Sequence, residues 1–374
     1  MNSLDRIIKS DERAIFELRA LYKSFGYSQY KMSRFEEYDL YVRNKDFLLS
    51  DEVITFTDRN GRLLALKPDV TLSIIKNSSD EKGLVEKLYY NENVYRVAPG
   101  THNFKEIMQA GLECIGDLSF YDISEVVLLA AKSLSLISES YVLDISHMGL
   151  IAAVLEDAGL SPQGKKQALT FLNQKNPHEL LSLCEAEGID KEKSEKIAAL
   201  AEISGTTEEV LSKLGDILTS EGEKKALAEF RTLFEIIKEA GFGDNVRIDF
   251  SVGNNMKYYS GVVFNGYVEG IPTSVLSGGQ YDKLLAKMKK GSSAIGFAIY
   301  LDLLERFEDE CLGYDIDTVL LNDGSTDPII LSEIANKLHS EGGVLVTSAI
   351  PKNIKYRRLM EIKEGVVTIL NEND

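Results

Sequence analysis

The spacing of apolar residues in the first part of the chain predicts one helix followed by a sheet. Residues 4–25 carry apolar side chains near the 3.6-residue period of an α-helix. After Gly26 the pattern changes to short β-rich runs. VITFTDRNGRLLALKP (53–68) predicts a hairpin that turns at Asn60-Gly61, because this pair tolerates the backbone conformation of a tight turn.

Two longer strands and a second helix are expected next. KLYYNENVYRV (87–97) and EIMQAGLECIGD (106–117) have the composition of strands, and a polar loop joins them. SEVVLLAAKSLSLI (124–137) predicts a helix, for which Ser124 would be the N-cap because a serine hydroxyl can accept a bond from the first turn.

The rest of the chain predicts a helical block, more sheet and a small α/β unit. Residues 151 to about 242 are rich in Leu, Ala, Glu and Lys, which predicts an all-helical insertion. Sheet segments return in NVRIDFSVG, KYYSGVVFNGYV, TSVLSGGQYD and SSAIGFAIYLDLL. From residue 313 the pattern predicts strand, helix, strand, helix, strand, in which YRRLMEIKEG (356–365) is the second helix and VVTIL the last strand.

Composition narrows the class of protein. The chain has 374 residues, 44% of them hydrophobic, enough for a large core and two domains. Its net charge of −17 argues against nucleic-acid binding, which needs a positive surface. Its N-terminal segment lacks the apolar core of a secretory signal, and no apolar run reaches the roughly 18 residues of a membrane span. We expect a cytoplasmic protein with reduced thiols at Cys114, Cys184 and Cys311 and without a metal site.

Six segments, in order, resemble the histidyl-tRNA synthetase family of class II aminoacyl-tRNA synthetases. They are GYSQYKMSRFEEYDLY (26–41), LKPDVT (66–71), VYRVAPGTHNFKEIMQAGLECIG (94–116), MKYYSGVVF (256–264), SGGQYDKLL (277–285) and IGFAIYLDLL (295–304). The resemblance implies an α+β fold in which helices flank an antiparallel sheet. It implies a synthetase-like domain over residues 1–312, with the helical insertion at about 151–242. Residues 313–374 would form a shortened anticodon-binding-like unit.

The departures from the family pattern fall on residues that handle phosphate. Asn254 and Leu303 stand at two positions where the family has arginine, and Gln280 replaces a third. The family's motif 3 ends Gly-Leu-Glu-Arg-Leu, whereas this chain reads Tyr-Leu-Asp-Leu-Leu from Tyr300. One lost donor to a transition state typically costs roughly 3 to 4 kcal/mol. We therefore expect no aminoacylation, no tRNA binding and no catalytic residue.

The residues that match the family's amino-acid pocket are better preserved. They are acidic, amide, hydroxyl and phenol groups together with one arginine, and we predict that they bind histidine as an effector: Asp69, Thr71, Arg96, Gln109, Glu113, Tyr258, Tyr259 and Tyr281. Simpler roles stay open for some. Asp69 could cap a helix that starts at Val70, and Gln109 and Glu113, on one face of a strand, could be structural. Gly278-Gly279 could be a turn that requires positive φ.

The chain keeps the family's amino-acid contacts but lacks several of its phosphate-binding arginines. In this it resembles one group of synthetase-like proteins, the regulatory subunits required by the short form of ATP phosphoribosyltransferase. This resemblance implies a non-catalytic subunit of the first enzyme of L-histidine biosynthesis, without a cofactor. It implies a hetero-octamer with the short-form catalytic subunit, histidine feedback, and a self-dimer through the segment 26–41. Two alternatives remain: a divergent but active histidyl-tRNA synthetase, and a synthetase paralogue that joins an adenylate to another acceptor.

Overall fold

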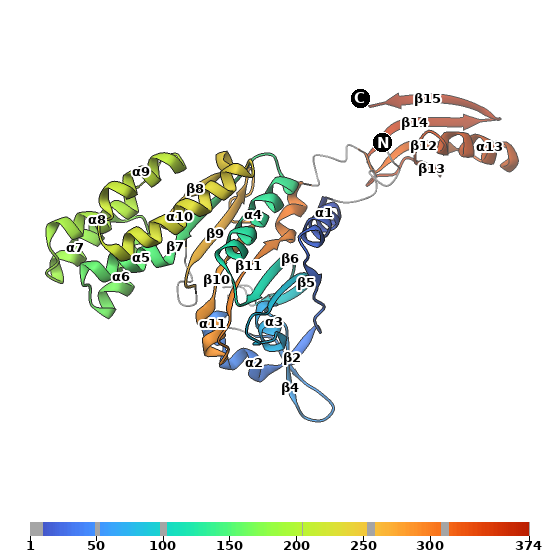
Figure 1. Cartoon of the computed structure of the whole chain (residues 1–374). Helices are drawn as coiled ribbons and strands as arrows, with labels where there is room; N and C mark the ends of the chain where they lie inside the picture. Colours follow the sequence, from blue (N-terminus) through green and yellow to red (C-terminus); the bar gives the residue numbers. More distant parts are fainter. Residues whose placement is uncertain are drawn as a thin grey trace. The chain divides into compact units, whose positions relative to one another are not determined.

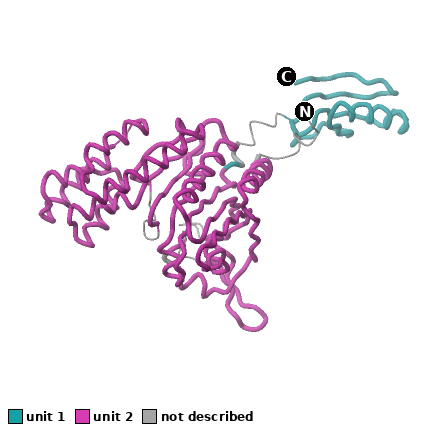
Figure 2. Tube along the Cα trace, viewed as in Figure 1, with its two compact units in different colours: residues 1–10, 304–374 teal, residues 11–303 magenta. Residues whose placement is uncertain are grey.

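The computed structural model describes residues 10–48, 53–97, 103–203, 205–252, 259–307 and 314–373. The chain divides into two compact units (Figure 2). The larger unit spans residues 11–303, and the smaller one is built mainly from residues 304–374. The segments that resemble the synthetase family lie almost wholly in the larger unit.

An eight-stranded mixed sheet forms the centre of the larger unit (Figure 1). Its order is β1-β5-β6-β11-β10-β9-β7-β8. The strands span Ser28–Gln29 (β1), Val85–Val97 (β5), Phe104–Gly116 (β6), Tyr141–His147 (β7), Val246–Ile248 (β8), Val262–Val268 (β9), Leu276–Gln280 (β10) and Ser293–Tyr300 (β11). The neighbours from β5 to β7 pair antiparallel, and only the edge strands β1 and β8 pair parallel. The predicted α+β fold with an antiparallel sheet flanked by helices is therefore confirmed.

Helix α4 (Phe120–Ile137) packs on one face of this sheet, against β9, β10 and β11. The helix starts four residues before the predicted position. Its N-cap is Ser119, whose hydroxyl accepts from the Asp122 amide while the Asp122 carboxylate accepts from the Ser119 amide. The prediction of Ser124 as the cap was wrong, because the reciprocal capping box lies upstream and Ser124 bonds the Phe120 carbonyl inside the helix.

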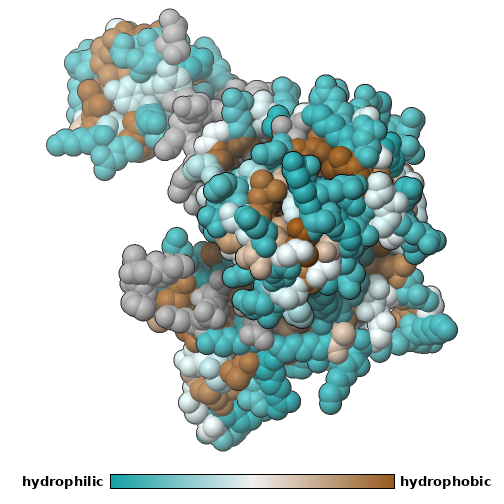
Figure 3. Space-filling view, turned by 90° about the vertical axis from the view of Figure 1, so that its left-hand side faces the viewer, coloured by the Kyte–Doolittle hydropathy of each residue, from teal (hydrophilic) through white to brown (hydrophobic). Residues whose placement is uncertain are grey.

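The helical insertion follows β7. It consists of Met148–Ala158 (α5), Pro162–Asn173 (α6), Pro177–Ala186 (α7), Lys191–Glu202 (α8), Thr207–Ile217 (α9) and Glu221–Glu239 (α10). Each helix from α6 on begins after a residue whose side chain accepts a bond from the first turn, namely Ser161, Asn176, Asp190, Thr206 and Ser220. Helix α10 packs on α4 and α5 and so joins the block to the sheet. The face of the molecule on this side is mostly hydrophilic, with apolar residues in small separate areas (Figure 3).

The N-terminal elements lie around the opposite end of the sheet. Helix α1 (Ser10–Ser24) is followed by β2 (Phe35–Glu37), α2 (Tyr38–Arg43), β3 (Thr55–Thr57), β4 (Leu63–Leu66) and α3 (Thr71–Asn77). Strands β2, β4 and β3 form a separate three-stranded sheet. The predicted hairpin is present as β3 and β4, and Gly61 in its turn has a φ of 78°. The larger unit also contains the short helices α11 (Asp282–Lys287), η2 (Lys45–Phe47) and η3 (Gly243–Asn245), and η4 (Leu301–Phe307) begins at its end.

The C-terminal unit is a four-stranded sheet covered by one helix. Its elements are β12 (Ile316–Asn322), α13 (Pro328–His339), β13 (Val344–Thr347), β14 (Tyr356–Lys363) and β15 (Val366–Glu372), and the strand order is β13-β12-β14-β15. The prediction of a helix at residues 356–365 was wrong. That segment pairs with β12 on one side and turns into β15 on the other.

The composition of β14 explains the error. YRRLMEIK is rich in residues with high helix propensity, but propensity is a weak signal that tertiary pairing overrides. Glu364 and Gly365, between the two strands, have φ of 49° and 82°, as a two-residue hairpin turn requires. Met360 and Ile362 of β14 are buried with Leu320 against α13, so the strand completes the small core.

Candidate functional site

One face of the large sheet forms the floor of a pocket. Along β9, Phe264 and Gly266 face α4, and Val263 and Asn265 line the pocket on the other face. The strand pairings align a row of residues across five strands: Tyr90, Gly111, Ala298, Ser277 and Asn265. The small side chains in the middle of this row leave room for the cavity, and the larger polar side chains at its two ends border the cavity.

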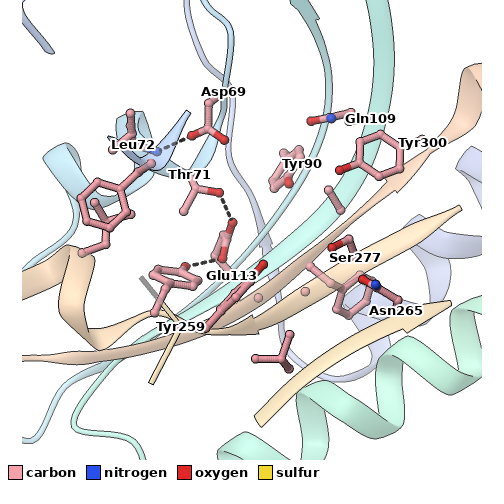
Figure 4. A pocket seen from close by; sticks show the side chains of 18 of the residues that line it. Asp69, Thr71, Leu72, Tyr90, Gln109, Glu113, Tyr259, Asn265, Ser277 and Tyr300 are labelled. Carbon is pink, nitrogen blue, oxygen red and sulfur yellow. Dashed lines mark hydrogen bonds between the residues drawn. The ribbon is translucent and has the colours of Figure 1, made fainter. Parts of the chain in front are cut away.

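Glu113 of β6 lies at the centre of the pocket (Figure 4) and is 2% exposed. Its Oε1 accepts a hydrogen bond of 2.6 Å from the Thr71 hydroxyl, and its Oε2 accepts one from the Tyr281 hydroxyl. Burial, with a smaller contribution from the charge of Asp69, raises the pKa of Glu113 to about 8, because the two hydrogen bonds only partly replace the lost hydration. At neutral pH the group therefore holds its proton for much of the time.

Asp69 stands on the wall beside it, just before α3. Its Oδ1 accepts a bond of 2.8 Å from the Leu72 amide, so it does cap the first turn of α3. The same side chain also lines the pocket. Desolvation raises the pKa of Asp69, while the Leu72 amide and the Arg96 charge act in the opposite direction. The structural and the ligand-facing interpretations of Asp69 are thus compatible.

Arg96 of β5 also lines the pocket. Its Nε donates to the Pro68 carbonyl at 3.1 Å. Burial raises the pKa of Tyr300, and the nearby Arg96 charge partly offsets this. Among the described residues that line the pocket, Arg96 is the one cationic side chain, whereas Asp69 and Glu113 supply two carboxyl groups.

The cavity has a volume of about 280 Å³. This lies just below the roughly 300–1,000 Å³ typical of ligand clefts. Polar groups of both hydrogen-bonding kinds converge on it, since carboxylates accept, a guanidinium donates, and phenol and threonine hydroxyls do either. Its size and chemistry suit a small zwitterion such as an amino acid.

The structure brings together seven of the eight residues predicted from sequence. Asp69, Thr71, Arg96, Gln109, Glu113, Tyr259 and Tyr281 all line the one cavity. Tyr258 lies outside the described residues, as does Asn254. Gly278 and Gly279 belong to β10 and not to a turn. A Cβ at Gly278 would lie 2.4 Å from the Cβ of Phe297, so close packing accounts for this glycine.

Seven further polar or aromatic residues line the pocket and were missed: Phe47, Tyr90, Asn265, Ser274, Ser277, Phe297 and Tyr300. Side chains alternate between the two faces of a strand, so the face of a residue could have been inferred from its spacing. Tyr90, for example, is an even number of residues from Arg96 and therefore lies on the same face. Which strands are neighbours was not predictable from such local spacing. Ser277 reaches the pocket only because β10 lies between β9 and β11.

The residues that stand at the family's phosphate-binding positions either make other contacts in this structure or lie outside the pocket. Gln280 accepts a bond of 2.8 Å from the Val262 amide, which ties β10 to β9. Leu303 is not among the residues that line the cavity, and Lys105 is exposed near the start of β6. The described part of these segments therefore offers the pocket one arginine and no lysine.

The cysteines and possible metal ligands among the described residues provide no second candidate site. Cys114 and Cys184 are buried free thiols, and Cys311 lies outside the described residues. No group of three or more His, Cys, Asp or Glu in the described ranges could hold a metal ion. Within those ranges, too, the helices are too short or too polar to cross a bilayer.

Comparisons with known proteins agree with the fold. Residues 4–304 match the family described as histidyl-tRNA synthetase. A curated relative from Clostridium acetobutylicum, described as ATP phosphoribosyltransferase regulatory subunit, is 30% identical over 335 residues, which cover 87% of this chain and 82% of that protein.

Two solved structures show the same fold. One is described as an ATP phosphoribosyltransferase regulatory subunit/histidyl-tRNA synthetase from Bacillus halodurans, with a TM-score of 0.74 and 24% identity, covering 96% of both chains. The other is a chain of the ATP phosphoribosyl transferase (HisG:HisZ) complex from Thermotoga maritima. Its TM-score is 0.61 at 20% identity, and the match covers 78% of this chain and 97% of that one.

Proposed function

The chain belongs to the family of ATP phosphoribosyltransferase regulatory subunits, which share the histidyl-tRNA synthetase fold, and we propose that its pocket is an effector site for L-histidine. The protein is a non-catalytic subunit that acts with the catalytic subunit in the first step of histidine biosynthesis, in the cytoplasm. The proposal assigns the amino-acid contacts to Asp69, Thr71, Gln109, Glu113 and Tyr281.

One observation carries the proposal: five polar groups that sequence alone had matched to an amino-acid pocket converge on one cavity of about 280 Å³. L-Histidine has an ammonium group, a carboxylate and an imidazole ring. Asp69 and Glu113 can accept from the ammonium group or the ring N–H, and Arg96 can donate to the carboxylate. Tyr259 and Tyr281 are proposed to border the ring.

The partner is the short-form catalytic subunit, with a hetero-octamer as the proposed assembly. The name of the solved Thermotoga complex supports a two-component enzyme for that protein. Regulation then requires a coupling free energy between the effector site and the catalytic subunit, typically about 1–3 kcal/mol. The test is therefore made on the reconstituted complex.

The experiment measures phosphoribosyl transfer to ATP by the complex over a range of histidine concentrations. Glu113→Ala should raise the histidine concentration for half-inhibition roughly 10- to 100-fold, since a hydrogen bond to a charged group contributes about 1.5–3 kcal/mol. Each curve is normalised to the same variant's rate without histidine. Glu106→Ala is the matched control, because Glu106 is an exposed glutamate on the same strand, bonded to Asn93 and Tyr95.

An unchanged inhibition curve for Glu113→Ala, with histidine still bound by the complex, would place the effector site at the subunit interface or on the partner. A second arm uses the isolated protein with ATP, histidine and labelled pyrophosphate. Because Asn254 and Leu303 stand at arginine positions of the family, we expect no histidine-dependent exchange. Exchange at a rate typical of synthetases would favour an active ligase instead.

A further inference from the structure

Helix α3 carries pocket residues at its start and is tied to the segment 28–37 along its length. The Thr71 hydroxyl donates a bond of 2.6 Å to Glu113 Oε1, and the Asp69 carboxylate accepts from the first turn of the helix (Figure 4). The helix has seven residues, and a helix this short is not stable by itself. Its position therefore depends on contacts with the rest of the unit.

Glu36 of β2 makes two of these contacts. Its Oε1 accepts a bond of 3.3 Å from the Ser73 hydroxyl, and its Oε2 accepts one of 2.9 Å from the Lys76 ammonium group. The Glu36 side chain is 16% exposed, so water screens this contact less than it screens an ion pair on the open surface. Residues three apart lie on the same side of a helix, so one carboxylate holds one side of α3.

Tyr30 holds the same side of α3 at a second point. Its hydroxyl lies 3.1 Å from the Ser73 hydroxyl and accepts a bond of 2.8 Å from Asn77 Nδ2. Tyr30 is itself fixed to the large sheet, because its backbone N–H donates to the Tyr89 carbonyl of β5 at 2.8 Å. The contacts of Tyr30 and Glu36 therefore join α3 to the sheet as well as to β2.

The chain also enters α3 from the side of this segment. Strand β4 pairs with β2, and just beyond β4 the Lys67 N–H donates to the Arg34 carbonyl at 3.1 Å. Residues 68–70 then lead to Thr71. The start of α3 and its exposed side are thus both attached to residues 30–36, and the pocket residues Asp69 and Thr71 lie between these attachments.

We propose that Glu36 and Tyr30 are positioning residues for the pocket: they hold one side of α3 and so set the place of the Thr71 hydroxyl. Neither is among the described residues that line the cavity, so an effect on a ligand has to pass through α3. The effect on a ligand rests on the proposed function. The position of Thr71 against Glu113 does not, because it can be measured in the empty protein.

The first experiment is a double-mutant cycle in which histidine binding to the full-length chain is measured by calorimetry. Glu36→Gln should weaken binding roughly threefold to tenfold and Thr71→Val about tenfold, the size of one lost hydrogen bond. Because Glu36 acts through Thr71, the double variant should bind within about twofold of Thr71→Val alone. Effects that multiply would show that the two residues act independently and would overturn the proposal.

Two further variants keep this cycle interpretable. Asp39→Asn is the matched control, since it removes a carboxylate from the same part of the chain and breaks only an exposed pair with Arg43 on α2. Its histidine affinity should equal that of the wild type. Tyr30→Phe removes a single hydroxyl group and takes the place of Glu36→Gln in the cycle if that variant does not fold.

The second experiment uses Glu113 as a reporter in the absence of ligand. Burial raises the pKa of Glu113 to about 8, the Thr71 and Tyr281 hydroxyls act to lower it, and the charge of Asp69 acts to raise it. The Tyr90 phenol, whose own pKa the Glu113 charge raises, also faces this carboxylate. Of these groups, Thr71 is the one that Glu36 and Tyr30 hold through α3.

Glu36→Gln and Tyr30→Phe should therefore raise the pKa of Glu113 further, as Thr71→Val does. The stability that falls as pH rises through this pKa should then continue to fall to higher pH than in the wild type. The measurement compares the unfolding temperature of each variant with that of the same variant carrying Glu113→Gln. No shift in Glu36→Gln and Tyr30→Phe would overturn the positioning role. If the shift is present but the wild type binds no histidine, the proposed effector site fails and the positioning role stands.

Discussion

Gly296 of β11 lies directly opposite Glu113 of β6, and the Glu113 carboxylate occupies the space that a side chain at this glycine would fill. A Cβ at position 296 would be 1.8 Å from Glu113 Oε2 and 2.5 Å from the Leu112 carbonyl oxygen. No pair of such atoms approaches this closely without displacement. The absence of a side chain at Gly296 is therefore a condition for the hydrogen bonds from Thr71 and Tyr281 to Glu113.

Gly296→Ala should displace Glu113 and abolish ligand binding in the pocket, while the sheet is retained. We expect at least a tenfold loss of histidine affinity by calorimetry and a lower unfolding temperature, since overpacking a tight site typically costs about 1–3 kcal/mol. Gly222→Ala is the matched control. Gly222 lies in α10, and a methyl group there would meet no other atom within 4 Å, so alanine should be neutral or stabilising. Equal affinities in the two variants would contradict the role of Gly296.

Glu113 should make the stability of the unliganded protein depend on pH. Its pKa is raised from near 4.5 to about 8 on folding, so the folded state holds the proton more tightly than the unfolded state does. The free energy of unfolding should therefore fall as pH rises from about 4.5 through 8. Thermal unfolding of the wild type and Glu113→Gln across this range should diverge, with the variant less sensitive to pH. Parallel curves would show that Glu113 titrates normally.

The protein by itself should be a two-fold dimer through the segment 26–41 and the adjoining strands. Phe35 and Phe56 meet edge to face at 5.6 Å and are 46% and 40% exposed, which leaves apolar surface available for a partner. Light scattering at micromolar concentration should give the mass of a dimer. Phe35→Asp should shift it to a monomer, whereas Phe104→Asp, a change at a residue that is 72% exposed on β6, should not. A monomeric wild type would contradict this assignment.

The two serines at the start of α4 should differ in their contribution to stability. Ser119→Ala removes the N-cap and its capping box, so the free energy of unfolding should fall by about 1 kcal/mol. Ser124 is buried and bonds only the Phe120 carbonyl within the helix. Ser124→Ala should cost less, because alanine has the higher helix propensity and the carbonyl keeps its backbone partner. Denaturant titration of both variants decides between them, and a larger loss at Ser124 would support the cap predicted from sequence.

Local patterns in the sequence determined most elements and much of the pocket. The two-residue period of a strand is a property of the backbone itself, so Gln109 and Glu113 had to share a face wherever β6 was placed. The Asn60-Gly61 turn and the caps of α6 to α10 depend on groups only a few residues apart, and such short-range preferences are readable in order along the chain. The family resemblance, which rests on residue types and their order alone, matched seven of the described residues that line this cavity.

Long-range pairing decided what local patterns left open. YRRLMEIK has the propensity of a helix and becomes β14 because β12 and β15 supply hydrogen-bond partners on both sides. Asn265, Ser277 and Tyr300 join the site only through the register of β9, β10 and β11, which residues far apart in sequence fix. The raised pKa of Glu113 has the same origin. Burial is a property of the whole packed sheet, and no neighbour in the sequence of Glu113 could indicate it.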